Sequence, residues 1–310
     1  RSFARYAWIL VGYLGLVILW GAWVRITGSG AGCGNHWPDC NGQVIPLSPT
    51  IKTLTEFFHR LTSGLSLPLV LGMLIWAYRV FPKGHGVRFA SWGTLLFLLS
   101  EAALGAGLVK FELVADDTSV ARAITASLHL INTFTLAGFA TLAAWWASQG
   151  YEVKWNPRSI ASRWLLPGLG ALLLTGMSGA VTALGDTLFP TTLGAAVHPA
   201  AGHFLVQLRI VHPLLAVASG VYLLFALQQV LESQQHLRGT LTLSALLGLQ
   251  LLLGAINVLL AAPGWMQLVH LGAALAVWLG SLLYWVQTQS APDAKKATPS
   301  PEMEMTPSPH

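Results

Sequence analysis

A series of long apolar segments, each long enough to cross a lipid bilayer, most constrains the fold of this chain. A membrane-spanning helix needs about 20 consecutive apolar residues. Eight such spans are expected, at residues 5–26, 53–80, 88–110, 121–148, 161–183, 203–230, 239–261 and 265–287. Only 9% of the residues are charged, whereas soluble domains carry about 25%. The chain is therefore predicted to be an all-α integral membrane protein surrounded by membrane lipid.

Lysine and arginine side chains gather at one end of these spans. Eleven of the 17 are expected there: Arg1, Arg5, Arg79, Lys83, Arg88, Lys154, Arg158, Arg163, Arg238, Lys295 and Lys296. Cytoplasmic loops carry such an excess of basic residues. Both termini are therefore predicted to be cytoplasmic, with the loop at 27–52 outside, in a multi-pass protein of the cell membrane. The net charge of +5 follows from this topology and does not indicate nucleic-acid binding.

Parts of the first four spans recur in the last four. The stretch EFFHRL resembles LRIVHPL, SEAALGAGLV resembles LQLLLGAINV, and LHLINTFTLAG resembles VHLGAALAVWLG. These matches align Glu101 with Gln250 and Gly105 with Gly254. Such an internal repeat predicts two structural units of the same kind. Because each unit begins and ends inside, they are expected to be two four-helix bundles related by a pseudo-twofold axis along the membrane normal.

The boundaries of the two units follow from the breaks between the apolar segments. The N-terminal half is predicted at 1–150 and the C-terminal half at 151–288. Residues 289–310, QSAPDAKKATPSPEMEMTPSPH, are rich in Pro, Ser, Thr and charge. This composition is typical of disorder, so they are expected to form a disordered cytoplasmic tail.

The outer loop at 27–52 contains the chain's two cysteines, Cys33 and Cys40. An oxidising compartment outside the membrane favours a disulfide between them. The pair then serves either as a staple that orders the loop or as a redox-active or partner-facing group. A zinc site is not favoured, because His36 is the one obvious third ligand and structural zinc sites use four.

Four of the ten histidines lie inside predicted spans: His59, His129, His212 and His270. Each follows the outer end of an even-numbered span, at a depth of roughly 8–15 Å given the rise of 1.5 Å per residue. A single histidine here often donates a hydrogen bond to a neighbouring helix. Four at one depth indicate function, since ionisable groups within the membrane mark functional sites and imidazole is an axial ligand of heme iron.

Four stretches give the chain a family resemblance: GAWVRITGSGAGCGNHWPDCNG, EFFHRLTSG, LHLINTFT and LGAINVLLAAPGWMQLVHLGAAL. Over residues 5–287 the sequence resembles the heme A synthase family of cytochrome oxidase assembly. The resemblance implies a heme-modifying oxidoreductase that oxidises a methyl group of heme O to a formyl group. The implied partners are heme O synthase, cytochrome oxidase assembly factors and an electron donor that the sequence does not identify.

The same resemblance implies a role for each half. His59 and His129 of the N-terminal half would bind the substrate, heme O. His212 and His270 of the C-terminal half would hold a resident heme B. Both heme sites are then expected toward the outer side of the membrane.

The stretch TLTEFFHRLTSG at 53–64 carries Glu56 three residues before His59, on the same helix face. Thr53 and Glu56 also fit a capping box at the start of a helix, and the residues alone do not decide between a cap and a functional carboxylate. The family resemblance favours a proton-handling or diol-stabilising role for Glu56. Arg60 is expected to anchor the helix at the interface, to bind heme propionates or to pair with Glu56. Further propionate candidates are Arg25 and Arg209.

Two other features of the spans bear on the sites. Glu101 falls near the bilayer centre, where a charge is costly, so we expect it to be protonated or hydrogen-bonded. Pro213, directly after His212, cannot donate to the carbonyl of Arg209, which predicts a local kink there.

Two other classes of protein compete with this interpretation. A di-heme cytochrome b-type electron carrier would use the same four histidines without changing a porphyrin, and it predicts no special role for Glu56. A heme or solute transporter predicts a continuous polar path to the cytoplasmic side, which the apolar inner halves of the spans do not offer.

Overall fold

The computed structural model describes residues 1–149, 156–191, 202–234 and 236–289, and within these ranges it contains helices and loops but no strand. The helices are α1 Ser2–Ile26, α2 Ile51–Val80, α3 Gly86–Lys110, α4 Val120–Gln149, α5 Ile160–Leu188, α6 Phe204–Gln207, the 3₁₀ turn η1 Leu208–Ile210, α7 Val211–Gln234, α8 Leu237–Leu259 and α9 Gly264–Thr288. The predicted tail, apart from its first residue, lies outside the described residues.

The prediction of eight spans is confirmed. Eight described helices are long and apolar enough to cross a membrane, when α6, η1 and α7 are taken together as Phe204–Ser233. Their surfaces also fit a lipid environment, because large apolar side chains stand exposed along them, among them Ile9, Leu96 and Leu252. Helices satisfy their backbone hydrogen bonds internally, which is what a span in lipid requires.

Two spans differ from the expected ones in ways that local residues explain. Helix α2 begins at Ile51, two residues early, because the Thr50 hydroxyl accepts a hydrogen bond from the backbone N–H of Thr53 at 3.1 Å. The sixth span is interrupted by the 3₁₀ turn at Leu208–Ile210, immediately before the segment that contains Pro213. A proline lacks the N–H that would continue the α-helical ladder, so the break falls where the sequence predicted a kink.

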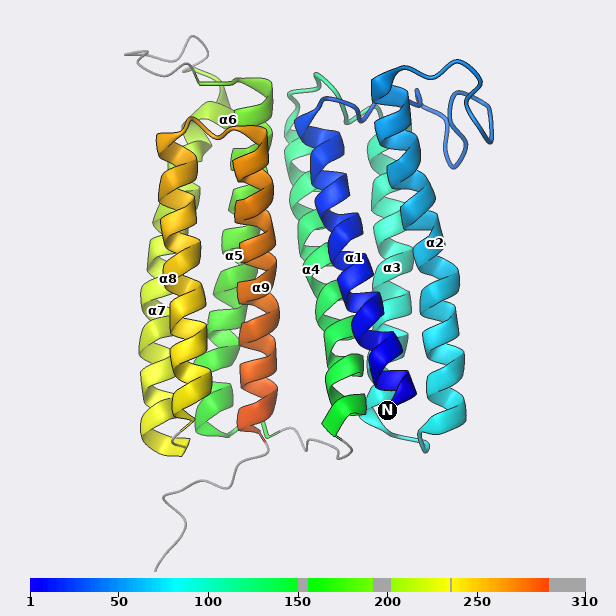
Figure 1. Ribbon diagram of the computed structural model, residues 1–310. Helices are drawn as coiled ribbons and strands as arrows, with labels where there is room; N and C mark the ends of the chain where they lie inside the picture. The colour runs from blue at the N-terminus through cyan, green and yellow to red at the C-terminus, as the bar shows by residue number, and fades with distance from the viewer. Residues whose placement is uncertain (150–155, 192–201, 235, 290–310) are drawn as a thin grey trace, which may run out of the picture.

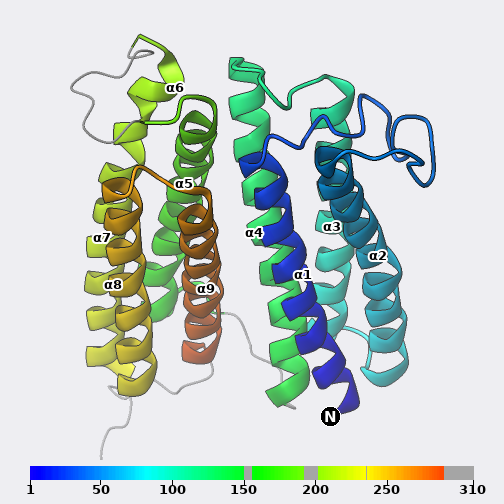
Figure 2. The same ribbon diagram turned by 45° about the horizontal axis from the view of Figure 1, so that its top comes forward.

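The long helices run side by side in two groups, α1–α4 and α5–α9 (Figures 1 and 2). The N-terminus and the α2–α3 connection lie at one end of the molecule. The α1–α2 loop, the α3–α4 loop, helix α6 and the α8–α9 connection lie at the opposite end. The four connections that the sequence placed outside the membrane therefore share one face of the molecule.

Each group has its own apolar core, and a third cluster joins the two. Small residues let the helices of the first group approach closely, including Ala7, Ala140 and Ala143, which are all fully buried. Between the groups, the Trp278 ring of α9 stacks on Phe134 of α4, and its Nε1 donates to the Phe134 carbonyl at 2.7 Å. These contacts fix the two groups of helices against each other.

Candidate functional site: two histidine pairs

The four span histidines lie at similar depths, measured from the helix ends on the face that carries the disulfide loop. Each is six to nine residues beyond the first residue of its span: His59 in α2, His129 in α4, His212 in α7 and His270 in α9. At 1.5 Å per residue these positions lie about 9–14 Å along the helices. The matched depth predicted from the sequence is therefore present in the structure.

Each histidine ring packs against a glycine of the preceding long helix. A Cβ atom added to Gly21 of α1 would lie 2.9 Å from Cε1 of His59, and one added to Gly179 of α5 would lie 2.9 Å from Cε1 of His212. The same distance, from an added Cβ to Cε1 of the ring, is 3.1 Å for Gly254 of α8 and His270. It is 3.9 Å for Gly105 of α3 and His129. In each case the absence of a side chain on the glycine leaves space for the imidazole of the next long helix.

The sequence singled out only two of these four glycines. The internal repeat aligned Gly105 with Gly254, but no sequence signal singled out Gly21 or Gly179. Both lie in apolar segments where a glycine serves equally well for close helix packing. Their proximity to a histidine depends on how each helix is rotated about its axis.

Three of the four span histidines have a ring nitrogen without a hydrogen-bond partner among the described residues. Within the described part of the chain, the Nδ1 atoms of His59, His129 and His270 are buried and have no hydrogen-bond partner. Most buried polar atoms in proteins do have one. In His212 the same atom is paired, lying 3.2 Å from the Ser178 hydroxyl and 3.1 Å from the Thr175 carbonyl.

The spacing of the C-terminal pair fits coordination of a single metal ion. The ring centres of His212 and His270 are 6.2 Å apart. Two imidazoles on opposite sides of one metal would have their centres about 6 Å apart, given metal–nitrogen bonds of about 2 Å. The distance between the two rings is therefore compatible with both binding one metal ion, such as a heme iron.

Glu101 of α3 lies beside His129, with its Oε1 atom 3.4 Å from Nε2 of the ring. The amide of Asn132 donates to Oε2 at 2.5 Å, and the hydroxyl of Thr133 donates to Oε1. Asn132 is itself held, because it also donates to the Phe97 carbonyl at 2.8 Å. The expectation that Glu101 is hydrogen-bonded is confirmed.

Gln250 of α8 occupies the equivalent place in the other group of helices. Its Nε2 atom lies 3.3 Å from Nε2 of His270. Its Oε1 atom is buried, and no partner for it is found among the described residues. The two residues that the repeat aligned thus stand next to corresponding histidines, one as an anchored carboxylate and the other as an amide whose oxygen is unpaired.

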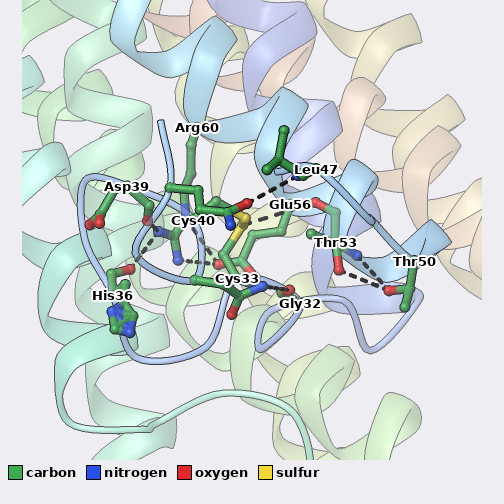
Figure 3. The surroundings of a disulfide bond; sticks show 12 residues. Gly32, Cys33, His36, Asp39, Cys40, Leu47, Thr50, Thr53, Glu56 and Arg60 are labelled. Carbon is green, nitrogen blue, oxygen red and sulfur yellow. Dashed lines mark hydrogen bonds and ion pairs between the residues drawn. A yellow bond between two sulfur atoms is a disulfide. The ribbon is translucent and has the colours of Figure 1, made fainter. Parts of the chain in front are cut away.

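Glu56 connects α2 to the outer disulfide loop (Figure 3). Its Oε2 atom accepts the backbone N–H of Cys33 at 2.8 Å, and its Oε1 atom pairs with the Arg60 guanidinium at 2.5 Å. The capping-box interpretation is wrong, because Thr50 caps the helix and Glu56 lies in the second turn with its carboxylate bonded to the loop. Glu56 is only 3% exposed, so this pairing is shielded from water.

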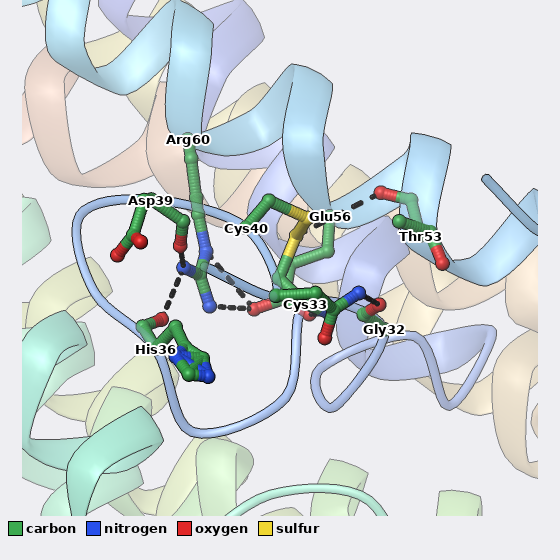
Figure 4. Close-up of polar contacts among 9 residues, drawn as sticks. Gly32, Cys33, His36, Asp39, Cys40, Thr53, Glu56 and Arg60 are labelled. Carbon is green, nitrogen blue, oxygen red and sulfur yellow. Dashed lines mark hydrogen bonds and ion pairs between the residues drawn. A yellow bond between two sulfur atoms is a disulfide. The ribbon is translucent and has the colours of Figure 1, made fainter. Parts of the chain in front are cut away.

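The predicted disulfide between Cys33 and Cys40 is present, and both cysteines are buried. Arg60 holds the same loop from the side, donating to the carbonyls of His36 and Asp39 at 2.6 Å each (Figure 4). Of the three roles considered for Arg60, the structure shows the pairing with Glu56. The loop is therefore fixed by one covalent bond and by two oppositely charged side chains of α2.

Arg25 and Arg209, the two further propionate candidates, interact with α5. Arg209 pairs with Asp186 at 2.8 Å between Nε and Oδ1, and it donates to the Gly185 carbonyl at 2.8 Å. Arg25 of α1 donates to the Thr187 hydroxyl of α5 at 2.5 Å and to the side chain of Gln267 in α9 at 3.0 Å. The sequence analysis missed Asp186, although an acidic residue at the end of a span was a usable signal. Arg25 thus joins the two groups of helices near their outer ends.

Together, the fold and these side chains define a multi-span helical membrane protein with two pairs of partly buried histidines between its helices. Residues 4–282 match the COX15-CtaA family, described as cytochrome oxidase assembly protein. The chain belongs to this family, and the match covers nearly all of the described helices.

Individual relatives support the same assignment. Proteins from two strains of Thermus thermophilus, each named protoheme IX farnesyltransferase, are 49% identical over 284 residues, which is 89% of this chain but 46% of each relative. The chain thus spans about half the length of these two relatives. A heme A synthase from Symbiobacterium thermophilum is 28% identical over 285 residues, 87% of this chain and 89% of the relative. The resemblance seen in the sequence motifs is confirmed.

Proposed function

We propose that this protein is a heme A synthase, which oxidises one methyl group of heme O to a formyl group. The observation that carries this proposal is the presence of two pairs of partly buried histidines between the helices, each ring lying against a glycine, in a chain of this family. Paired imidazoles at one depth suit two hemes that exchange electrons across a short distance. A single structural role, such as a hydrogen bond between helices, does not account for four equivalent positions.

The two sites have different roles in this proposal. His59 and His129 of the N-terminal half, 1–150, bind heme O as the substrate. The C-terminal half, 151–288, holds a resident heme B between His212 and His270, and this heme supplies electron transfer when it is bound. The spacing of this second pair supports the assignment.

The two halves are related by a pseudo-twofold axis along the membrane normal, with both termini in the cytoplasm. The equivalent contacts of Glu101 with His129 and of Gln250 with His270 support this relation. So does the distribution of basic residues, which favours a cytoplasmic location for the end that carries the N-terminus. Both heme sites then lie toward the outer side of the membrane.

Three further side chains act on the substrate or on the hemes in this proposal. Glu56, one turn from His59, handles protons or stabilises the hydrated product of methyl oxidation. Because its carboxylate is also bonded to the outer loop, the loop holds this group in place. Arg25 and Arg209 lie near the outer ends of the helices, where guanidinium groups suit the propionates of a heme.

We infer that heme O reaches the protein from a protoheme IX farnesyltransferase, the enzyme class named for the two relatives at 49% identity. Those relatives are about twice as long as the matching region, which is consistent with a physical association of the two activities. Other cytochrome oxidase assembly factors are the expected recipients of the product.

Pigment analysis of the purified protein tests the proposal. The protein is produced in cells that make heme O, and the extracted porphyrins are separated by chromatography. Heme A and its hydroxylated precursor are expected in the wild type, and neither is expected in a His59→Ala, His129→Ala variant. Bound heme without heme A in the wild type would instead indicate an electron carrier.

A further inference from the structure

We propose that Glu101 makes the heme of the N-terminal half exchangeable by offering His129 a second partner, and that the C-terminal half has no such device. This inference rests on the proposed function, in which one half must bind substrate and release product while the other half retains its heme. It assigns a role to a partly buried carboxylate of α3 that the proposed reaction does not use.

The first observation is that the Glu101 carboxylate is held in place by helix α4, which also carries His129. Asn132 and Thr133, three and four residues beyond His129, both donate to it. The Ser100 hydroxyl donates to the Asn132 side chain at 2.5 Å. The carboxylate is therefore positioned toward the ring before any ligand arrives.

The second observation is that the C-terminal half lacks this arrangement. The residues three and four positions beyond His270 are Ala273 and Ala274, which have no group to donate. Gln250 is neutral, and its side-chain oxygen has no partner among the described residues. The same place is therefore filled by an amide that contacts His270 itself but is not held by the two residues that correspond to Asn132 and Thr133.

The physical consequence concerns the ring nitrogen Nε2, the imidazole atom that reaches furthest from the backbone. This atom either carries a hydrogen that it donates to an acceptor, or it presents its lone pair to a metal, but not both. A hydrogen bond to a carboxylate is roughly twice as strong as one between neutral groups. Glu101 therefore competes with heme iron for His129 more effectively than Gln250 competes for His270.

The apolar surroundings of the membrane increase the difference between Glu101 and Gln250 as competitors for their histidines. A carboxylate surrounded by apolar helices is costly unless it has hydrogen-bond partners, so Glu101 gains by keeping the His129 ring as an additional partner. A site that releases its product needs a ligand that can leave the iron. Glu101 supplies an alternative partner for that ligand, because its Oε1 atom lies 3.4 Å from Nε2 of the ring.

The experiment measures how fast each half loses heme to an excess of apomyoglobin. Two double variants of the full chain each retain one histidine pair. His212→Ala with His270→Ala retains the N-terminal pair. His59→Ala with His129→Ala retains the C-terminal pair. Heme B is the probe in both double variants. The N-terminal half is expected to lose heme faster than the C-terminal half.

The decisive variants exchange the two residues. Glu101→Gln is expected to slow heme loss from the N-terminal half by about tenfold, which corresponds to about 1.4 kcal/mol. It should also raise the low-spin fraction of the heme spectrum, because His129 then stays on the iron. In the C-terminal half, Gln250→Glu combined with Ala273→Asn and Ala274→Thr is expected to accelerate heme loss.

Heme loss at the wild-type rate or faster in Glu101→Gln would overturn the inference. Glu101 would then have no effect on the binding of His129 to the iron, or would strengthen it. If Glu101→Gln does not fold, the reciprocal C-terminal variant decides, and unchanged heme loss there rejects the competition. Failure of the double variant that retains the N-terminal pair to bind any heme would instead reject the proposed function. Heme A formation is measured separately, so the two failures are distinguished.

Discussion

The two histidine pairs differ most in the charged residue three positions before the first histidine of each pair. In the N-terminal half this residue is Glu56, bonded to Arg60 and to the disulfide loop. In the C-terminal half the repeat places Arg209 there, paired with Asp186 of α5. The sign of the charge is thus reversed at matching positions. One backbone pattern carries two chemically different surroundings, which is expected where one half reacts and the other stores.

The two halves also differ in the side chain that lies beside the second histidine of each pair. Glu101 beside His129 has three anchoring contacts, whereas Gln250 beside His270 has an unpaired oxygen. The histidines and their neighbouring glycines are common to both halves, so they cannot distinguish the proposed roles of the halves. The distinction must lie in the side chains around the histidines, and variants of these side chains test it.

The largest effect is expected from removing one pair of histidines. His212→Ala with His270→Ala should abolish binding of heme B in the C-terminal half and leave heme binding in the N-terminal half. An absorption spectrum with quantified pigment extraction measures both. Full retention of both hemes in this double variant would show that the histidine pairs are not the ligands.

Replacing Glu56 tests whether its half is the reactive one. Glu56→Gln keeps the size of the side chain and an acceptor for the Cys33 N–H, but it removes the negative charge. Heme A output should fall by about 10²-fold or more, as for a lost acid–base group, with both hemes still bound. Turnover and pigment composition beside the wild type provide the measurement.

Arg60→Gln is the matched control for this variant, because it breaks the same ion pair and leaves the carboxylate in place. A smaller loss of output is expected from it than from Glu56→Gln. Equal losses in the two variants would reduce Glu56 to a clamp of the outer loop.

The glycines beside the rings provide a graded test of the two sites. Gly179→Ala places a Cβ 2.9 Å from the His212 ring, so the ring must move. Overpacking of this kind costs typically about 1–3 kcal/mol, which predicts about 5- to 150-fold weaker binding of heme B if the whole cost falls on the bound state. Gly105→Ala is the control, because its Cβ would make only an ordinary contact of 3.9 Å with His129. Similar heme affinities in the two variants would argue against a specific role for these glycines.

The smallest effect is expected from the disulfide. A ring this short constrains the unfolded chain by roughly 2–3 kcal/mol in the chain-entropy model. Cys33→Ser with Cys40→Ser should therefore lower thermal stability and loosen the loop, while heme binding at both pairs is retained. Thermal unfolding followed by near-ultraviolet circular dichroism measures the change. A loss of heme A output as large as that of Glu56→Gln would favour a redox role for the pair.

Much of the architecture was determined by the sequence itself. Eight spans follow from the lengths of the apolar segments, because lipid leaves the backbone few alternatives to a helix. The depth of the four histidines follows from the fixed rise per residue once the spans are placed. The Cys33–Cys40 bond follows from two cysteines in one short outer loop. These are local properties of the chain and need no knowledge of its neighbours.

The tertiary structure decided which side chains meet. Thr53 and Glu56 fit a capping box in the sequence, but Thr50 caps the helix, which begins at Ile51, and Glu56 accepts from the Cys33 backbone instead. The contact of Glu101 with His129, the pairing of Arg209 with Asp186 and the glycine beside each ring were likewise set by packing. The physical reason is rotational. An apolar segment specifies where a helix begins and ends, but nearly uniform hydrophobicity leaves its rotation about its own axis to the packing of its neighbours.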